Sequence, residues 1–210
     1  MVPLTGPPRG LALLLLAAAL VGLAPGAASA QGVDSTQTPL LDTSAPDTTV
    51  DPDVPFVRTP ERIVNRMLEL ANVSEDDVVY DLGSGDGRIP ITAAQRYGAR
   101  GVGIEIQPGL VQKARRKAET AGVADQVEFR QQDLFRADIS DATVVTLYLL
   151  PDVNTKLRPM LFEQLAPGTR VVSHGFDMDE WTPDQVIQVD NTYLYLWTIP
   201  KTIPDSLRSQ

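Results

Sequence analysis

Val79-Tyr-Asp-Leu-Gly-Ser-Gly-Asp-Gly-Arg88 is the stretch of sequence that decides the fold. It begins with apolar residues typical of a short buried strand, and Asp81 stands near the end of that strand. Gly83, Gly85 and Gly87 follow at a spacing of two, and a helical pattern comes directly after them. Glycines at such a turn let the backbone bend sharply and let a ligand approach closely. The stretch therefore predicts a strand, a ligand-binding turn and a helix in succession.

The spacing of the glycines selects among nucleotide cofactors. A dinucleotide fingerprint would need glycine at position 88, where this chain has arginine. Asp81 can instead face the ammonium group of a cationic ligand. Glu105 ends the next predicted strand, where a carboxylate can accept hydrogen bonds from both ribose hydroxyls. Asp133 follows the third strand, placed to accept from an adenine amino group, with Leu134 against the ring. Together these positions predict a pocket for S-adenosylmethionine.

Outside this stretch, residues 59–199 alternate helical and strand patterns. Helices are expected over 60–71, 89–97, 108–120 and 152–165, with Thr59 and Asp152 as the caps of the first and last, and strands over 78–80, 101–106, 127–130, 143–149, 170–173, 185–189 and 193–199. Strands separated by helices imply right-handed crossovers, whereas the last two leave no room for a helix. The predicted fold is α/β, a three-layer Rossmann-like sandwich whose seven-stranded, mostly parallel sheet has an antiparallel C-terminal hairpin. Ligands should bind at the carboxyl ends of its strands.

The composition excludes several kinds of metal site and catalytic nucleophile. The 210 residues include no cysteine and a single histidine, which excludes disulfide scaffolds, thiolate and multi-histidine metal sites and cysteine nucleophiles. No metal is therefore expected. The formal net charge of -9 argues against nucleic acid as a partner. A sulfonium cofactor suits this composition because it supplies its own reactivity.

The first thirty residues have the layout of a secretory signal peptide. Arg9 is followed by an apolar run over 11–23, and the small residues 28–30 resemble a cleavage site. The run is shorter than the ~20 residues of a membrane-spanning helix, so no stable membrane anchor is expected. We expect cleavage after Ala30 and export to the periplasm or the medium. The alternatives are an uncleaved anchor, or a start codon assigned too far upstream, in which case the protein is cytoplasmic.

A linker is expected between this leader and the folded domain. Residues 31–53 are acidic, rich in Thr, Ser and Pro, and nearly devoid of large apolar side chains. Such a composition cannot bury enough surface to offset the entropy of ordering, so it predicts a flexible segment. The folded domain then spans residues 54–210, and we expect it to be monomeric.

Over about residues 55–200 the chain resembles the class I, Rossmann-like methyltransferases. More narrowly, it is similar to the small bacterial relatives of the mitochondrial lysine methyltransferases that act on ATP synthase subunit c and the adenine nucleotide translocase. The segments that carry the resemblance are Val54–Pro60, Val79–Arg88, Gly103–Glu105, Asp133–Phe135, Thr146–Pro151 and Arg170–His174. The resemblance implies S-adenosylmethionine as cofactor, a protein lysine or small amine as methyl acceptor, and a lid formed by Pro55–Pro60. The expected cofactor-binding residues are Thr59, Asp81, Gly83, Gly85, Gly87, Glu105, Asp133 and Leu134.

One departure leaves the acceptor open. Many amino-group methyltransferases carry Asp/Asn-Pro-Pro-Tyr/Phe after the fourth strand, whereas this chain has Leu147-Tyr-Leu-Leu-Pro151. Tyr148 is our candidate for the acceptor pocket, because its ring can contact a cationic sulfonium or ammonium and its hydroxyl can orient an amine. It could equally be a strand tyrosine that packs against a helix. His174, at the end of the fifth strand, could relay a proton or simply satisfy a backbone carbonyl.

Several other features have two interpretations. Asp86 and Arg88 either contact cofactor or pair with each other at the start of a helix. The basic cluster over 113–117 is typical of a solvated helix face. Trp181 and the alternating aromatic residues of 193–197 either pack in the core or border a substrate groove. For the whole protein, the alternatives to N-methylation are a non-catalytic S-adenosylmethionine-binding module of the cell envelope and aminopropyl transfer from decarboxylated cofactor.

Overall fold

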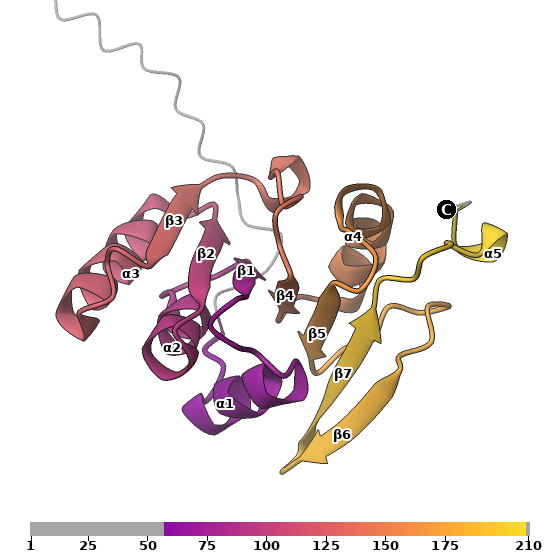
Figure 1. Ribbon diagram of the computed structural model, residues 1–210, viewed down its shortest axis with the longest axis horizontal. Helices are drawn as coiled ribbons and strands as arrows, with labels where there is room; N and C mark the ends of the chain where they lie inside the picture. The colour runs from indigo at the N-terminus through magenta and orange to yellow at the C-terminus, as the bar shows by residue number, and fades with distance from the viewer. Residues whose placement is uncertain (1–56, 209–210) are drawn as a thin grey trace, which may run out of the picture. The chain divides into compact units, whose positions relative to one another are not determined.

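The computed structural model describes residues 57–208. The predicted signal peptide and linker lie outside the described residues. The elements, shown in Figure 1, are α1 (Glu61–Leu70), β1 (Val78–Leu82), α2 (Arg88–Tyr97), β2 (Arg100–Glu105), α3 (Pro108–Ala121), β3 (Val127–Gln131), the 3-10 turn η1 (Leu134–Arg136), β4 (Val144–Leu147), α4 (Pro151–Gln164), β5 (Arg170–His174), β6 (Gln185–Val189), β7 (Thr192–Thr198) and α5 (Asp205–Arg208). All the predicted strands and helices are present, and only α5 and η1 were not expected.

The sheet has seven strands in the order β3-β2-β1-β4-β5-β7-β6. The pairs within β1 to β5 are parallel, whereas β7 runs antiparallel to both β5 and β6. This confirms the predicted mixed sheet and its C-terminal hairpin. Because the order changes direction between β1 and β4, the carboxyl ends of these two strands flank the position at which α/β sheets bind ligands.

Helices cover both faces of the sheet. On one face α1 and α2 pack against Val79, Val144 and Val172, and α2 and α3 pack around Phe129 of β3. On the other face α4 covers a core whose buried residues include Tyr80 and Trp197. In Figure 1 α4 stands apart from the other three long helices. The molecule therefore has the three layers that the sequence predicts.

Both predicted helix caps differ from the structure. Pro60, not Thr59, is the N-cap of α1, and its carbonyl accepts hydrogen bonds from the backbone of residues 63 and 64. Thr59 stays outside the helix because its own carbonyl is bound by Arg88. Likewise α4 begins at Pro151 with Leu150 as N-cap, so Asp152 lies within the first turn. Proline is favoured at the first helical position because the N–H that it lacks would have no partner there.

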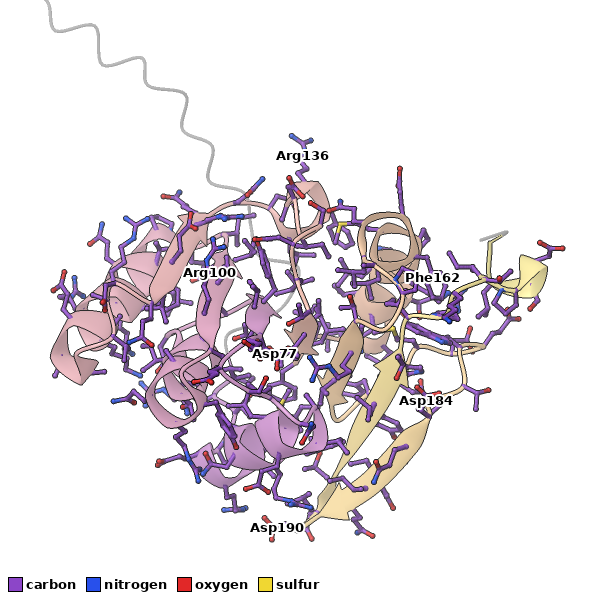
Figure 2. The ribbon with its side chains drawn as sticks, viewed as in Figure 1. Asp77, Arg100, Arg136, Phe162, Asp184 and Asp190 are labelled. Carbon is purple, nitrogen blue, oxygen red and sulfur yellow. The ribbon has the colours of Figure 1, made fainter. Side chains whose placement is uncertain are left out.

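The amino end of the sheet is locked by one buried carboxylate. Asp77, labelled near the centre of Figure 2, accepts hydrogen bonds from Ser74 N at 2.8 Å and from Thr143 Oγ1 at 2.6 Å. It also forms an ion pair with Arg170 at the start of β5. These contacts join the beginnings of β1, β4 and β5. The opposite, carboxyl edge of the sheet has the cavity described below.

Within residues 57–208, no helix is both long enough and apolar enough to cross a bilayer.

The tip of the β6–β7 hairpin is joined to α1 by an ion pair between Arg62 and Asp190. Figure 2 shows the labelled Asp190 at the far end of β6.

Candidate active site

A cavity of about 860 Å³, including its open mouth, lies at the carboxyl edge of the sheet. Its walls come from the segments that follow β1, β2, β3 and β4, with Val57 and Thr59 from the segment before α1. This size is within the range of small-molecule and cofactor sites. Seven of the ten predicted site residues line it: Thr59, Asp81, Gly83, Glu105, Asp133, Leu134 and Tyr148. Gly85, Gly87 and His174 are not among the lining residues.

Asp81 is a buried carboxylate at the cavity wall. It is 4% exposed, and its Oδ1 accepts a 2.8 Å hydrogen bond from Thr146 Oγ1 on the neighbouring strand. Burial raises the pKa of Asp81 to about 7; the Thr146 hydrogen bond and the charge of Arg88 oppose the rise, whereas Glu105 and Asp86 add to it. Among the described residues, no cation forms an ion pair with Asp81. A buried carboxylate without an ion-pair partner at a ligand cavity favours a positively charged group in the ligand.

Glu105 holds the glycine turn in shape. Its Oε2 accepts a hydrogen bond from Gly85 N at 2.9 Å, and its Oε1 accepts one from Gln107 N at 2.8 Å. The side chain is 7% exposed and lines the cavity. Each carboxylate oxygen has a second lone pair, so Glu105 can still accept hydroxyl donors from a ligand. Gly85, predicted to bind cofactor, does not line the cavity; its N–H binds Glu105, which does.

Gly87 has a packing role. Its φ is +77°, and a Cβ atom there would lie 2.6 Å from the Phe129 ring and 2.7 Å from Ala114. Only glycine allows the turn and the α3–β3 layer to approach so closely. Gly83 differs because it lines the cavity, at a φ of +79°. The three glycines of the motif therefore serve different purposes, and equal spacing in sequence did not reveal this.

The Asp86 carboxylate is neutralised within the protein. It accepts hydrogen bonds from Arg88 Nε and Nη2 at 2.9 and 2.8 Å, and from Lys117 Nζ at 2.6 Å. Burial alone would raise its pKa, but the bonds from Arg88 and Lys117 bring the pKa of Asp86 well below its ordinary value. Of the two interpretations from sequence, the pairing of Asp86 with Arg88 is confirmed. Lys117, expected on a solvated face, takes part in this pairing.

Asp133 and Leu134 form the far wall of the cavity. The Asp133 carboxylate accepts a 3.0 Å hydrogen bond from Phe135 N, which caps the 3-10 turn η1. Its side chain is 37% exposed, so the carboxylate remains accessible from the cavity. Both residues occupy the edge at which the sequence predicted them.

Tyr148 and His174 stack against each other at the ends of β4 and β5. Their ring centroids are 3.9 Å apart and the ring planes are inclined by 32°. Tyr148 lines the cavity, whereas His174 is 5% exposed and lies behind it. Burial lowers the pKa of His174 to about 4, so the imidazole is neutral at physiological pH. Nδ1 of this ring is buried without a hydrogen-bond partner in the described structure, so it does not satisfy a backbone carbonyl.

Sequence reasoning missed several lining residues. Ser84 lies inside the glycine motif, lines the cavity and has a buried hydroxyl with no hydrogen-bond partner among the described residues. Its place between two motif glycines was a signal that could have found it. Gln132 and Ile106 also line the cavity, and they stand next to predicted strand-end residues. The two tryptophans, Trp181 and Trp197, are buried away from the cavity and pack in the core.

Comparison with known proteins agrees with this arrangement. The model of the family described as the ANTKMT methyltransferase domain matches residues 81–185. A protein-lysine N-methyltransferase from Saccharolobus islandicus is 48% identical over 153 residues, covering 70% of this chain and 95% of that protein. The mouse adenine nucleotide translocase lysine N-methyltransferase is 38% identical over 64% of this chain, which spans only 58% of that longer protein.

A solved structure from Salinibacter ruber is also similar. It is described as an RNA methyltransferase in complex with S-adenosyl-L-homocysteine. It is 68% identical to this chain, covers 72% of it and 99% of its own length, and has a TM-score of 0.71. The family match includes the glycines of the motif and the strand-end acids Asp81, Glu105 and Asp133. The chain therefore belongs to the ANTKMT family of class I, S-adenosylmethionine-dependent methyltransferases.

Proposed function

We propose that this protein transfers a methyl group to the ε-amino group of a lysine in a protein. The observation that carries the proposal is the 48% identity to an archaeal protein-lysine N-methyltransferase across 95% of that relative. A match over nearly the whole length includes the strand ends that build the cavity. Lysine is also the acceptor in the names of the mouse and human relatives.

The residues of the cavity fit S-adenosylmethionine. Asp81 has no cationic partner among the described residues and would bind the ammonium group of the cofactor. Glu105 and Asp133 keep accessible carboxylate oxygens and would accept hydrogen bonds from the ribose hydroxyls and the adenine amino group. Leu134 supplies an apolar surface for the adenine ring, and Gly83 lets the ligand approach the backbone. When bound, the cofactor supplies a methyl group that its sulfonium has already activated.

The protein then has to orient the acceptor and exclude water. Tyr148 lines the cavity at the end of β4, where its hydroxyl oxygen can accept a hydrogen bond from an N–H of the acceptor amine and leave the nitrogen lone pair free. His174 stacks against that ring, and because its imidazole is neutral it adds no positive charge beside the cationic sulfonium of the cofactor. In this proposal Tyr148 orients the amine and His174 positions Tyr148. The amine reaches the site already deprotonated.

Methylation of RNA is the second candidate, because the Salinibacter ruber structure is described as an RNA methyltransferase. The net negative charge of the domain favours a protein over RNA as the methyl acceptor. Residues 61–210 contain 22 acidic and 16 basic side chains, whereas binding to a phosphate backbone depends on an excess of lysine and arginine.

One labelling experiment separates the candidates. The purified full-length protein is incubated with tritiated S-adenosylmethionine and a cell extract. One portion of the labelled product is then treated with protease and another with ribonuclease. We expect label that protease releases and ribonuclease leaves, located on lysine by mass spectrometry. Asp81→Asn is the inactive control, and Arg100→Met is the control for a surface charge change, because Arg100 pairs only at the surface with Glu128 and Asp141. Label released by ribonuclease would transfer the assignment to RNA.

We also propose that the mature protein is exported, monomeric and without a stable membrane anchor. The export proposal is supported by the signal-peptide pattern of residues 1–30. The monomer proposal is supported by the surface of residues 57–208, where only four large apolar side chains are exposed. Light scattering of the purified protein tests the monomer, and cell fractionation tests the location.

A further inference from the structure

One arginine side chain joins two parts of the cavity wall that are distant in sequence. Arg88 Nη1 donates a 2.6 Å hydrogen bond to the carbonyl of Thr59, and its Nε and Nη2 bind the two carboxylate oxygens of Asp86. The two partners are 27 residues apart in the sequence. Asp86 belongs to the glycine turn, whereas Thr59 belongs to the segment of residues 57–60 that precedes α1. Because one partner in this bridge is a main-chain carbonyl, no side-chain motif in the sequence predicts the bridge.

The anchor for Arg88 is itself held firmly. Asp86 is 1% exposed, and its Oδ2 also accepts a 2.6 Å hydrogen bond from Lys117 of α3. The Arg88–carboxylate contact is bidentate, a geometry that fixes direction as well as distance. The guanidinium therefore has little freedom to turn, and Nη1 is held toward the segment of residues 57–60.

That segment forms part of the cofactor cavity. Val57 and Thr59 both line the cavity, with Thr59 5% exposed and Val57 58% exposed. On its C-terminal side the segment continues into α1, whose apolar stripe is buried in the core. The Thr59 carbonyl, bound by Arg88, is its second attachment, and a longer third contact places Arg58 Nε 4.0 Å from Asp86 Oδ2. Of the two contacts to Asp86, the one through Arg88 has the shorter distances, and it ties the main chain of the segment to the glycine turn.

We propose that Arg88 is a positioning residue for methyl transfer, which fixes residues 57–60 across the cofactor cavity by joining the Thr59 carbonyl to the buried Asp86 carboxylate. The proposal rests on the binding of S-adenosylmethionine in this cavity and is independent of the acceptor. Its consequence is tighter cofactor binding, because the wall formed by Val57 and Thr59 is already in place before the ligand arrives.

Arg88 also lines the cavity, so a direct contact with the ligand would be a different role. The two roles separate in the protein without ligand. A bridge restrains residues 57–60 at all times, whereas a direct contact has no effect on them until ligand is bound. Trypsin reports this restraint, because Arg58 is the first lysine or arginine after Arg9, and its side chain is 61% exposed although its Nε lies 4.0 Å from Asp86 Oδ2.

The experiment compares the full-length protein with Arg88→Met and Arg88→Lys, and uses Arg100→Met as the control with the same charge change. The rate of cleavage at the Arg58–Thr59 bond is measured by mass spectrometry without ligand. The dissociation constant of S-adenosylhomocysteine is measured by calorimetry, and KM for S-adenosylmethionine is compared with kcat. Because neither trypsin nor calorimetry needs an acceptor, this test can fail while the lysine proposal holds, and the reverse.

We expect Arg88→Met to speed cleavage at Arg58 and to weaken S-adenosylhomocysteine binding, each by about tenfold or more, which corresponds to one hydrogen bond to a charged group. KM should rise by a similar factor, with kcat changed less than about threefold. Arg88→Lys should lie between Met and wild type, and Arg100→Met should match wild type. Cleavage at Arg58 that is unchanged in Arg88→Met would overturn the proposal. If Arg88→Met does not fold, Arg88→Lys decides by the same cleavage measurement.

Discussion

Thr146 Oγ1 donates a 2.8 Å hydrogen bond to Asp81 Oδ1 across paired positions of β4 and β1. This is the one hydrogen bond found for the Asp81 side chain within residues 57–208, and it leaves the carboxylate without a cationic partner there. A charge so placed costs folding free energy and favours a cationic ligand. The same residue therefore opposes stability and supports binding, which leads to two separate predictions.

The first prediction concerns stability. In the folded protein burial raises the pKa of Asp81 to about 7, above its ordinary value of 3.8. The favourable contribution of Asp81 to the free energy of unfolding is thus complete below pH 3.8, and it is lost as the pH rises through 7. Asp81→Asn should raise the free energy of unfolding of the ligand-free protein at pH 8 by about 1 kcal/mol or more, and by less at pH 5. Denaturant titrations at the two pH values measure this; a destabilised variant at pH 8 would contradict it.

The second prediction concerns cofactor binding. Protonation of Asp81 removes the charge that attracts the ligand ammonium. The affinity for S-adenosylhomocysteine should therefore fall as the pH drops below 7, by up to about tenfold per pH unit. Calorimetry from pH 8 to pH 6 tests this. In Asp81→Asn the affinity should be weaker at pH 8, and the fall between pH 8 and 6 should be absent; an unchanged slope in the variant would assign the titration to another group.

The stacked pair at the acceptor side gives a third prediction. Tyr148→Phe keeps the ring that lies 3.9 Å from His174 but removes the hydroxyl. We expect kcat to fall by about tenfold or more, while S-adenosylhomocysteine binding changes by less than about threefold. Because the pKa of His174 is about 4, His174→Asn should leave the shape of the rate profile between pH 6 and 9 as in wild type. A lost inflection in that range would show that His174 itself carries a proton.

A fourth prediction tests the packing role of Gly87. Gly87→Ala would place a Cβ atom 2.6 Å from the Phe129 ring at a φ of +77°. It should destabilise the protein by about 2–4 kcal/mol through overpacking and backbone strain. Gly109→Ala is the control, because it lies in α3 with nothing within 4 Å of the added atom. That change should be neutral or stabilise by about 0.5 kcal/mol. Thermal unfolding of both variants provides the comparison.

The fifth prediction tests the proposed export. Expression of the natural gene in its own host should give a mature protein that begins at Gln31, found by N-terminal mass spectrometry in the periplasm or medium. An intact Met1 in the cytosol would contradict the proposed signal peptide. A cytosolic protein would also have direct access to cellular S-adenosylmethionine.

Local patterns in the sequence were sufficient for the fold. Gly98 and Gly122 close α2 and α3 in the left-handed conformation, and the continuous apolar character of β4 marked a strand buried on both faces. Each of these signals lies within a few residues of the element that it defines. The acids at strand ends were predictable for the same reason, because Asp81 and Glu105 are placed by their own strands.

The contacts that complete the site could not be predicted, because they join distant parts of the chain. The stacking of Tyr148 on His174 requires β4 and β5 to lie side by side in one register. The constraint on Gly87 comes from Phe129, which lies in a strand two crossovers later. The cap of α1 moved by one residue because Arg88 binds the Thr59 carbonyl. In each case the deciding partner is set by topology, which single-sequence periodicity does not contain.

The two buried tryptophans have a practical consequence for spectroscopy. Trp181 and Trp197 are the only tryptophans of the chain, and their rings lie 5.6 Å apart in the core beside α4. Trp197 Nε1 also donates a 2.6 Å hydrogen bond to the Trp181 carbonyl. Neither ring lines the cofactor cavity. Intrinsic fluorescence therefore reports on the integrity of this side of the sheet, so the same protein sample can give an unfolding signal that is independent of occupancy at the active site.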